Sequence, residues 1–289
     1  MDKPRKIKFA VFSRASEEMA VALAEGIERR GGESSTEVLA QAYAVISRPL
    51  AALGASRIAP TVSQGHPHLR WLNKLDAISR SAAGVTLFLD TDMLVMRDIG
   101  GWFEGLATDD LTFWNLRRRP GDVAEGTTIP NQLNPHPFCR HYGVEAVPIM
   151  LGGGHYFFRN TPRGQAILQR IADIMLEASE NPEALYWKFA GRDNFVGDEP
   201  AASMAVVEMG VKLPEPSPMA PNPPVGCFMV PWQRWTDVNL AEGVARYWCE
   251  WAQAEVEPAV IHFAGDGKHD PVYRAHVAAC WEAVHGIAS

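Results

Sequence analysis

Two aspartates one residue apart, Asp90 and Asp92, follow the largely apolar run 85–89. A run of this kind is typical of a strand buried on both faces, as at the centre of a parallel sheet. Residues i and i+2 of an extended segment point the same way, so we expect the two carboxylates to converge. A divalent cation removes the repulsion between them and binds oxygen ligands. The spacing indicates a metal site, with a turn in which one aspartate caps the next element as the alternative.

A second polar group lies near the C-terminus, in the segment 260–268. A predicted strand places His262 at its end, and Gly265 and Lys268 follow. An imidazole nitrogen is a suitable ligand for Mn²⁺, a lysine supplies a point charge for a phosphate, and glycine lets the backbone approach a ligand closely. Taken alone, His262 is better explained as a core histidine at a strand end, and Lys268 is better explained as a solvated surface charge. Together with the aspartate pair they predict one site for a cation and a phosphate.

These motifs resemble those of a known family. Residues 88–99 are similar to the D-x-D segment of GT-A-fold glycosyltransferases, especially glycosyltransferase family 8, the relatives of glycogenin and of bacterial galactosyltransferases. His262, Gly265 and Lys268 match the H-x-x-G-x-x-K element of that family, although His269 stands where a proline is usual. The resemblance implies an α/β fold of the GT-A type (Rossmann-like), which is an open, mixed, mostly parallel sheet with helices on both faces in a single domain.

The resemblance also implies an activity. The expected protein is a glycosyltransferase of the hexosyltransferase type, which moves a sugar from a nucleotide diphosphate donor, a UDP-sugar, to a glycan or small-molecule acceptor with retention of configuration. The expected metal is Mn²⁺, or Mg²⁺ in its place, held by Asp90, Asp92 and His262 against the donor diphosphate. We expect the nucleotide-sugar half to cover residues 1–115 and the acceptor side residues 116–289.

Three further positions follow the family less closely. Asp198, at the start of a predicted helix, stands where relatives have an acid near the reacting carbon of the donor sugar, and helix capping is the alternative. Lys74, on the helix before the aspartate pair, stands where relatives often direct a basic residue at the donor, and an exposed lysine is the alternative. Ser13 stands where relatives hold the nucleotide. The expected catalytic residue is Asp198, and the expected donor-binding residues are Ser13, Lys74, Asp90, Gly265 and Lys268.

The elements that must position these residues alternate between strands and helices, which favours one open α/β domain. In such a sheet, ligands bind outside the carboxyl ends of the strands. Short apolar runs predict strands at 7–12, 85–89, 111–114, 155–159 and 259–263. Helical periodicity and start signals predict helices from Ser16 as N-cap to about Gly31, and at 71–78, 162–178, 198–209 and 271–284, with Thr161 capping the third of these.

The composition limits the class of protein. The chain has 289 residues, 47% of them hydrophobic and 21% charged, as in an ordinary globular protein. A formal net charge of -7 argues against nucleic acid as a partner. The four cysteines are scattered, so we expect neither a disulfide framework nor a structural zinc site, and a reducing, cytoplasmic location fits best. No apolar run is long enough to cross a membrane.

Two other classes of protein remain open. A phosphatase of the haloacid-dehalogenase type also has D-x-D after an apolar strand and uses the first aspartate, here Asp90, as nucleophile. It normally has Thr or Val where Leu94 stands, and a later acidic pair, for which Asp109 and Asp110 come too early. The third class is a catalytically silent protein that binds carbohydrate or a nucleotide-sugar. Metal-dependent binding of UDP separates the transferase from the phosphatase.

Overall fold

The largest sheet of the computed structural model has six strands. They are β1 (Lys8–Phe9), β2 (Val38–Gln41), β3 (Ser56–Arg57), β4 (Val85–Asp90), β6 (Leu111–Thr112) and β9 (His155–Arg159). Their order is β3-β1-β2-β4-β9-β6. β3, β1, β2 and β4 are parallel, whereas β9 is antiparallel to both β4 and β6, so the sheet is mixed.

The structure describes residues 8–9, 14–30, 38–41, 56–57, 71–79, 85–99, 108–127, 132–150, 155–191, 196–214, 227–228, 234–249, 253–263 and 265–285.

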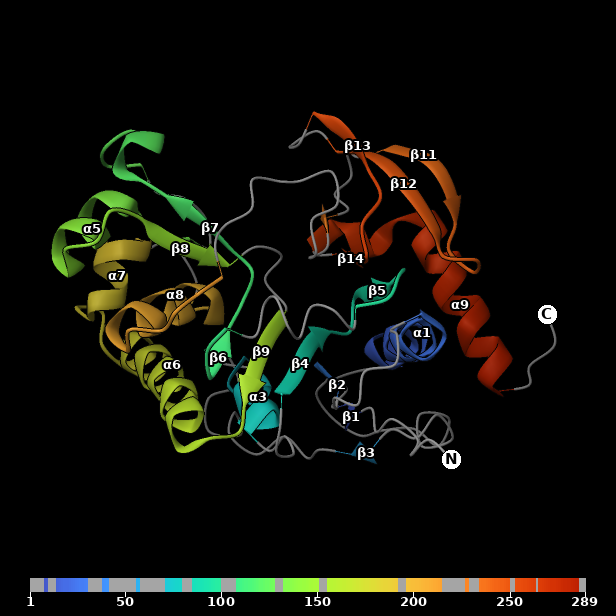
Figure 1. Cartoon of the computed structure of the whole chain (residues 1–289), viewed down its shortest axis with the longest axis horizontal. Coiled ribbons are helices and arrows are strands. Elements are labelled where there is room, and N and C mark those ends of the chain that lie inside the picture. The colour runs from blue at the N-terminus through green and yellow to red at the C-terminus, as the bar shows by residue number, and fades with distance from the viewer. Residues whose placement is uncertain are drawn as a thin grey trace.

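Figure 1 shows the helices that accompany these strands. They are α1 (Arg14–Arg30), α3 (Trp71–Ser79), α5 (Pro135–Tyr142), α6 (Pro162–Glu180), α7 (Leu185–Ala190), α8 (Asp198–Glu208) and α9 (Pro271–His285), with short 3₁₀ turns η2 (Pro120–Asp122) and η3 (Gly265–His269). α3 contacts β2 and α6, and α1 contacts α9. The Thr161 hydroxyl accepts a hydrogen bond from the Gly164 amide, which confirms the predicted cap of α6. The predicted N-cap at Ser16 is wrong, because α1 already begins at Arg14.

Three smaller sheets lie among the described residues. The first contains β5 (Met93–Val95), β10 (Cys227–Phe228) and β14 (Val260–His262), the second β11 (Arg234–Asn239), β12 (Val244–Cys249) and β13 (Ala254–Val256), and the third β7 (Asn115–Arg118) and β8 (Val147–Met150). The predicted α/β class is confirmed, whereas the GT-A assignment stays a prediction. Among the helices that the structure describes, none is both long and apolar enough to cross a bilayer.

β4 occupies the middle of the large sheet, between β2 and β9. Its residues 86–89 are buried, as expected for a strand covered on both faces. Burial of side chains such as Leu87, Phe88 and Leu89 contributes about 1.5–3 kcal/mol each. This strand is therefore a rigid support for the aspartate at its carboxyl end.

The turn after β4 leads into a different sheet. β5 pairs antiparallel with β14, with Met93 opposite His262. The Phe263 amide donates a hydrogen bond to the Asp92 carbonyl at 2.8 Å, and the Met96 amide donates one to the Ala259 carbonyl at 2.7 Å. These backbone bonds hold the C-terminal part of the chain against the segment that follows β4.

β5 is also held from the side by α1. At Gly26, an added Cβ would lie 2.9 Å from the Val95 carbonyl oxygen. That oxygen belongs to the backbone of β5, so it cannot move without shifting the strand. Glycine at this position therefore permits the close approach of α1 to β5.

We expect the Gly26→Ala substitution to lower the free energy of unfolding by about 1–3 kcal/mol, because the methyl group overpacks this contact. Better helix propensity offsets at most about 1 kcal/mol of that loss. Urea unfolding followed by circular dichroism measures the difference. The control is Gly121→Ala, where an added Cβ meets no described atom within 4 Å. Equal destabilisation by both variants would contradict the close-contact explanation.

Candidate active site

The centre of the site is a buried lysine. Lys74 lies on α3 with only 1% of its surface exposed, so the alternative of an exposed helix lysine is wrong. Its ammonium lies 2.8 Å from Asp198 Oδ2 and 3.4 Å from Asp90 Oδ1. It also lies 5.5 Å from the ring centroid of Phe88 and 5.8 Å from that of Tyr156, within the range of cation–π attraction. Lys74 therefore links the end of β4 to the start of α8.

The alternation of strand side chains explains this arrangement. Phe88 and Asp90 are two residues apart on β4 and face the same side of the sheet. Tyr156 lies directly opposite Phe88 on β9, so it faces that side as well. The Tyr156 hydroxyl donates a hydrogen bond to Asp198 Oδ2 at 2.9 Å. The lysine and the tyrosine thus hold one carboxylate oxygen from two directions.

Asp198 is the first residue of α8, and the N-cap position is Gly197, with no side-chain cap bond. The carboxylate of Asp198 bonds Lys74 and Tyr156 instead. An acid in the first turn still complements the helix dipole. The alternative in which Asp198 only caps the helix is therefore wrong, because its side chain points into the site.

The other half of the site is formed by the turn after β4. Asp92 Oδ1 lies 3.1 Å from His262 Nε2. Asp90, Asp92 and His262 each offer a ligand atom, and these atoms all lie within 4.8 Å of one another. The expected extended geometry is wrong at Asp92, since Thr91 and Asp92 form a turn between β4 and β5. The turn and the β5–β14 pairing bring the three side chains together.

The site carries more negative than positive charge. Burial raises the pKa of Asp90 to about 6, although Lys74 acts in the opposite direction. Burial also raises the pKa of Asp92, but the charge and the hydrogen bond of His262 outweigh it, so that this pKa is lowered. Burial and the neighbouring Asp198 raise the pKa of Glu199, the next residue of α8, to about 7. A cation bound between these carboxylates would reduce the repulsion between their charges.

His155 is a site residue that the sequence did not single out. It is buried on β9 opposite Leu89, and its Nε2 accepts a hydrogen bond from the Trp114 amide at 2.8 Å. Burial lowers the pKa of His155 to about 3, so the ring is neutral and Nδ1 carries the proton. Among the described residues, Nδ1 has no hydrogen-bond partner. The sequence feature that could have indicated His155 is a histidine in an otherwise apolar strand, directly after three glycines.

The other residues that the sequence predicts for donor binding or for a phosphatase lie in separate parts of the chain. Lys268 is exposed on η3, and its charge contributes to the lowered pKa of Asp92, so it lies near the turn. Gly265 begins η3, three residues after His262. Ser13 lies outside the residues that the structure describes. The acidic pair considered for a phosphatase is bound elsewhere, because Asp109 and Asp110 pair with Arg163.

With the site in place, the chain can be compared with known proteins. No model of a protein family matches the chain, and no curated protein matches it. The glycosyltransferase GlyE of Streptococcus pneumoniae TIGR4 has a similar structure, with a TM-score of 0.38 and 16% identity over 69% of this chain and 43% of that chain. Its apo form gives a TM-score of 0.40 and 16% identity over 72% of this chain and 44% of that chain. The chain thus spans less than half the length of that protein.

We expect the Lys74→Met substitution to lower the free energy of unfolding by about 3–5 kcal/mol, because it leaves the buried carboxylates of Asp90 and Asp198 without their cation. Chemical denaturation at neutral pH measures the loss. Lys188→Met, at an exposed lysine of α7, is the matched control and should change little. A Lys74 variant as stable as this control would show that the ion pairs do not hold the site together.

In metal-free protein, Asp90 and Asp92 should affect the pH dependence of stability with opposite signs. Because the pKa of Asp90 is raised, its contribution to stability falls as the pH rises from about 4 to about 6. The Asp90→Asn variant should therefore gain up to about 3 kcal/mol relative to the wild type over this range. Because the pKa of Asp92 is lowered, its contribution is present above its ordinary pKa and is lost in acid.

The Asp92→Asn variant should accordingly lose stability relative to the wild type as the pH rises. Unfolding by urea at several pH values, with a chelator present, measures both slopes. Slopes of the same sign for the two variants would contradict the different environments of the two carboxylates.

Proposed function

We propose that the chain is a metal-dependent glycosyltransferase of the GT-A type, which transfers a hexose from a UDP-sugar to a hydroxyl of a glycan or small-molecule acceptor. The observation that carries the proposal is the convergence of Asp90, Asp92 and His262 next to the buried Lys74–Asp198 pair. Retention of configuration and the choice of UDP follow from the resemblance to family 8. Residues 1–115 would form the donor half and residues 116–289 the acceptor side.

The side chains suit a divalent cation. Two carboxylates and an imidazole are ligands that Mn²⁺ accepts, and Mg²⁺ would depend more on the oxygens. Ligand atoms within 4.8 Å of one another can reach one ion. Asp90 Oδ1 is buried, lies 3.4 Å from the Lys74 ammonium and makes no hydrogen bond to a described residue, so a metal ion would supply the close partner that this oxygen lacks. When bound, Mn²⁺ or Mg²⁺ would stabilise the charge that develops on the leaving diphosphate.

Basic residues near the metal ligands would bind the donor phosphates. Lys268 is exposed, and an ammonium in that position can pair with a phosphate oxygen. Gly265, at the start of η3, lets the backbone approach the diphosphate, and Ser13 would contact the nucleotide. Lys74 already binds two carboxylates, so its role would be to hold Asp90 and Asp198 in position.

Asp198 would be the residue closest to the chemistry. Its two bonds to Lys74 and Tyr156 both end on Oδ2, so Oδ1 is the oxygen that can accept a hydrogen bond from a hydroxyl of the donor sugar. A carboxylate in this place would also stabilise positive charge that develops at the anomeric carbon. Because its rotamer is fixed by two partners, the oxygen is positioned before the substrate arrives.

The first test is metal-dependent binding of UDP, measured by isothermal titration. We expect UDP to bind in the presence of Mn²⁺ and to bind at least ten-fold more weakly with chelator. Asp92→Asn should abolish the metal dependence, whereas Asp173→Asn, at an exposed aspartate of α6, should not. Binding of UDP that is the same with and without Mn²⁺ would refute the proposal, and release of phosphate from small phosphoesters would favour the phosphatase.

The second test separates the phosphate contact from the rest of the donor site. We expect Lys268→Ala to weaken binding of UDP by about ten- to one-hundred-fold and to leave binding of uridine unchanged, because a charge-assisted bond contributes about 1.5–3 kcal/mol. The control is Lys188→Ala, at the exposed lysine of α7. If both ligands weaken equally, Lys268 does not act through the diphosphate.

A further inference from the structure

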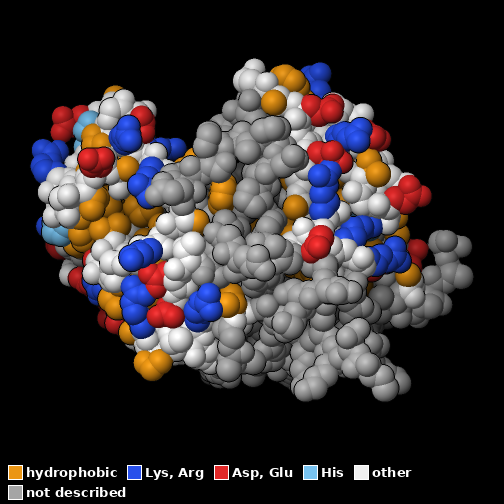
Figure 2. All heavy atoms as spheres, viewed as in Figure 1, with side chains coloured by type: hydrophobic (Ala, Val, Ile, Leu, Met, Phe, Trp, Pro, Cys, Tyr) orange, Lys and Arg blue, Asp and Glu red, His pale blue; other side chains and the backbone are white. Residues whose placement is uncertain are grey.

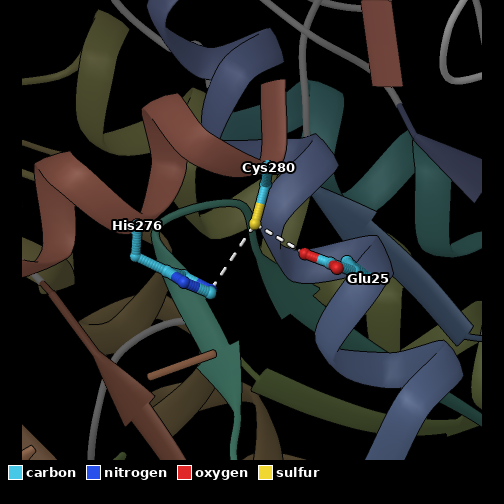
Figure 3. Close-up of side chains that lie close together, drawn as sticks. All are labelled: Glu25, His276 and Cys280. Atoms are coloured by element: carbon cyan, nitrogen blue, oxygen red, sulfur yellow. Dashed lines mark hydrogen bonds between the residues drawn. The ribbon is translucent and has the colours of Figure 1, made fainter. Parts of the chain in front are cut away.

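A second group of potential metal ligands lies away from the candidate active site, where α1 packs against α9. Figure 3 shows Glu25 of α1 facing His276 and Cys280 of α9. The Cys280 thiol donates a hydrogen bond to Glu25 Oε2 at 2.6 Å and lies 3.6 Å from His276 Nε2. The ligand atoms of the three side chains all lie within 4.8 Å of one another. Among the described residues, this cluster and the one at Asp90 are the two that could hold a metal ion.

The spacing on α9 explains why two of these side chains meet. His276 and Cys280 are four residues apart, so they lie on one face of the helix, one turn apart. A tetrahedral zinc site with Zn–S of about 2.3 Å and Zn–N of about 2.0–2.1 Å separates sulfur from nitrogen by about 3.6 Å. The observed separation of 3.6 Å between Sγ and Nε2 equals this value. The two residues of α9 are thus already spaced for one zinc ion.

The third ligand, the carboxylate of Glu25, needs only a small movement to bind the same ion as His276 and Cys280. A hydrogen bond now joins Cys280 Sγ and Glu25 Oε2, which lie 2.6 Å apart. When a metal replaces the thiol proton, the distance between these two atoms would lengthen by about 1 Å. Glu25 Oε1 pairs with Arg29 at 2.6 Å, whereas Oε2 faces the thiol. The carboxylate can therefore bind a metal through Oε2 and keep Arg29 as its second partner.

Charge and access also favour a divalent ion. A thiolate and a carboxylate together neutralise Zn²⁺, so the neighbouring Arg29 and Arg30 would face a site of no net charge. Cys280 is 5% exposed, but the Glu25 side chain is 25% exposed, which leaves an open side. A water molecule can take the fourth position there, as in zinc sites with three protein ligands.

We propose that Glu25, His276 and Cys280 form a zinc site that joins α1 to α9. Its ligands include a soft thiolate, whereas the cluster of Asp90, Asp92 and His262 offers hard oxygens and an imidazole. The thiolate therefore favours Zn²⁺ over Mn²⁺ and Mg²⁺ at this site. Binding releases the thiol proton of Cys280 to solvent and replaces it with the metal–sulfur bond. Because the metal binds the folded chain, it raises the melting temperature.

A cobalt titration of the full chain tests this inference without relying on activity. Co²⁺ bound to a thiolate gives an intense charge-transfer band in the near ultraviolet, and Co²⁺ bound only to oxygen and imidazole does not. We expect the wild type to develop this band with one Co²⁺ per chain, and Zn²⁺ to remove it. We expect Cys280→Ser to abolish the band and His276→Gln to weaken Co²⁺ binding at least ten-fold.

Matched variants show which of the two metal sites gives the charge-transfer band. Asp92→Asn removes a ligand of the other cluster and should keep it, and Cys139→Ser removes a different buried cysteine and should keep it as well. Zn²⁺ should raise the melting temperature of the Asp92→Asn variant and not that of Asp92→Asn combined with His276→Gln, whose metal-free fold is checked by circular dichroism. A wild type without the band, or a band that survives Cys280→Ser, would overturn the proposal.

Discussion

The candidate site depends on one buried ammonium group. A charge without contact with water must be paired, and Lys74 is paired with Asp198 and Asp90. These pairs join α3, β4 and α8, and the bond from Tyr156 adds β9 as a fourth element. The shape of the site follows from this requirement, because moving any one of the four elements would leave a charged or polar group in the interior unpaired. On the face shown in Figure 2, charged side chains lie interspersed with apolar ones.

A second constraint brings in the C-terminal part of the chain. The turn at Thr91 and Asp92 ends the large sheet, and the pairing of β5 with β14 begins another. His262 reaches Asp92 through this pairing, and the Phe263 amide fixes the turn from the same side. The carboxylate of Asp198 therefore lies in a different environment from those of Asp90 and Asp92. Asp198 is held by Lys74 and Tyr156, whereas Asp90 and Asp92 retain the close approach of like charges that a cation relieves.

The local sequence was sufficient to predict some features and not others. The apolar run of β4, the cap at Thr161 and the convergence of Asp90, Asp92 and His262 followed from residue types and spacing, helped by the resemblance to a family. The burial of Lys74 could not be predicted, because it depends on Asp198, which is distant in the chain. The roles of Tyr156 and His155 depend on the register between β4 and β9, which no local pattern contains. The turn at Asp92 was weighed only as the alternative, because an i, i+2 pair in an extended segment explains converging carboxylates directly.

The central claim is that Asp90, Asp92 and His262 hold one cation against a diphosphate. A crystal structure of the chain with Mn²⁺ and UDP, with anomalous scattering recorded for manganese, tests it most directly. We expect an anomalous peak within bonding distance, about 2.0–2.3 Å, of Asp90, Asp92 and His262 and of a phosphate oxygen of UDP. UDP bound at the end of β4 with no manganese between it and these side chains, or manganese bound elsewhere, would contradict the account.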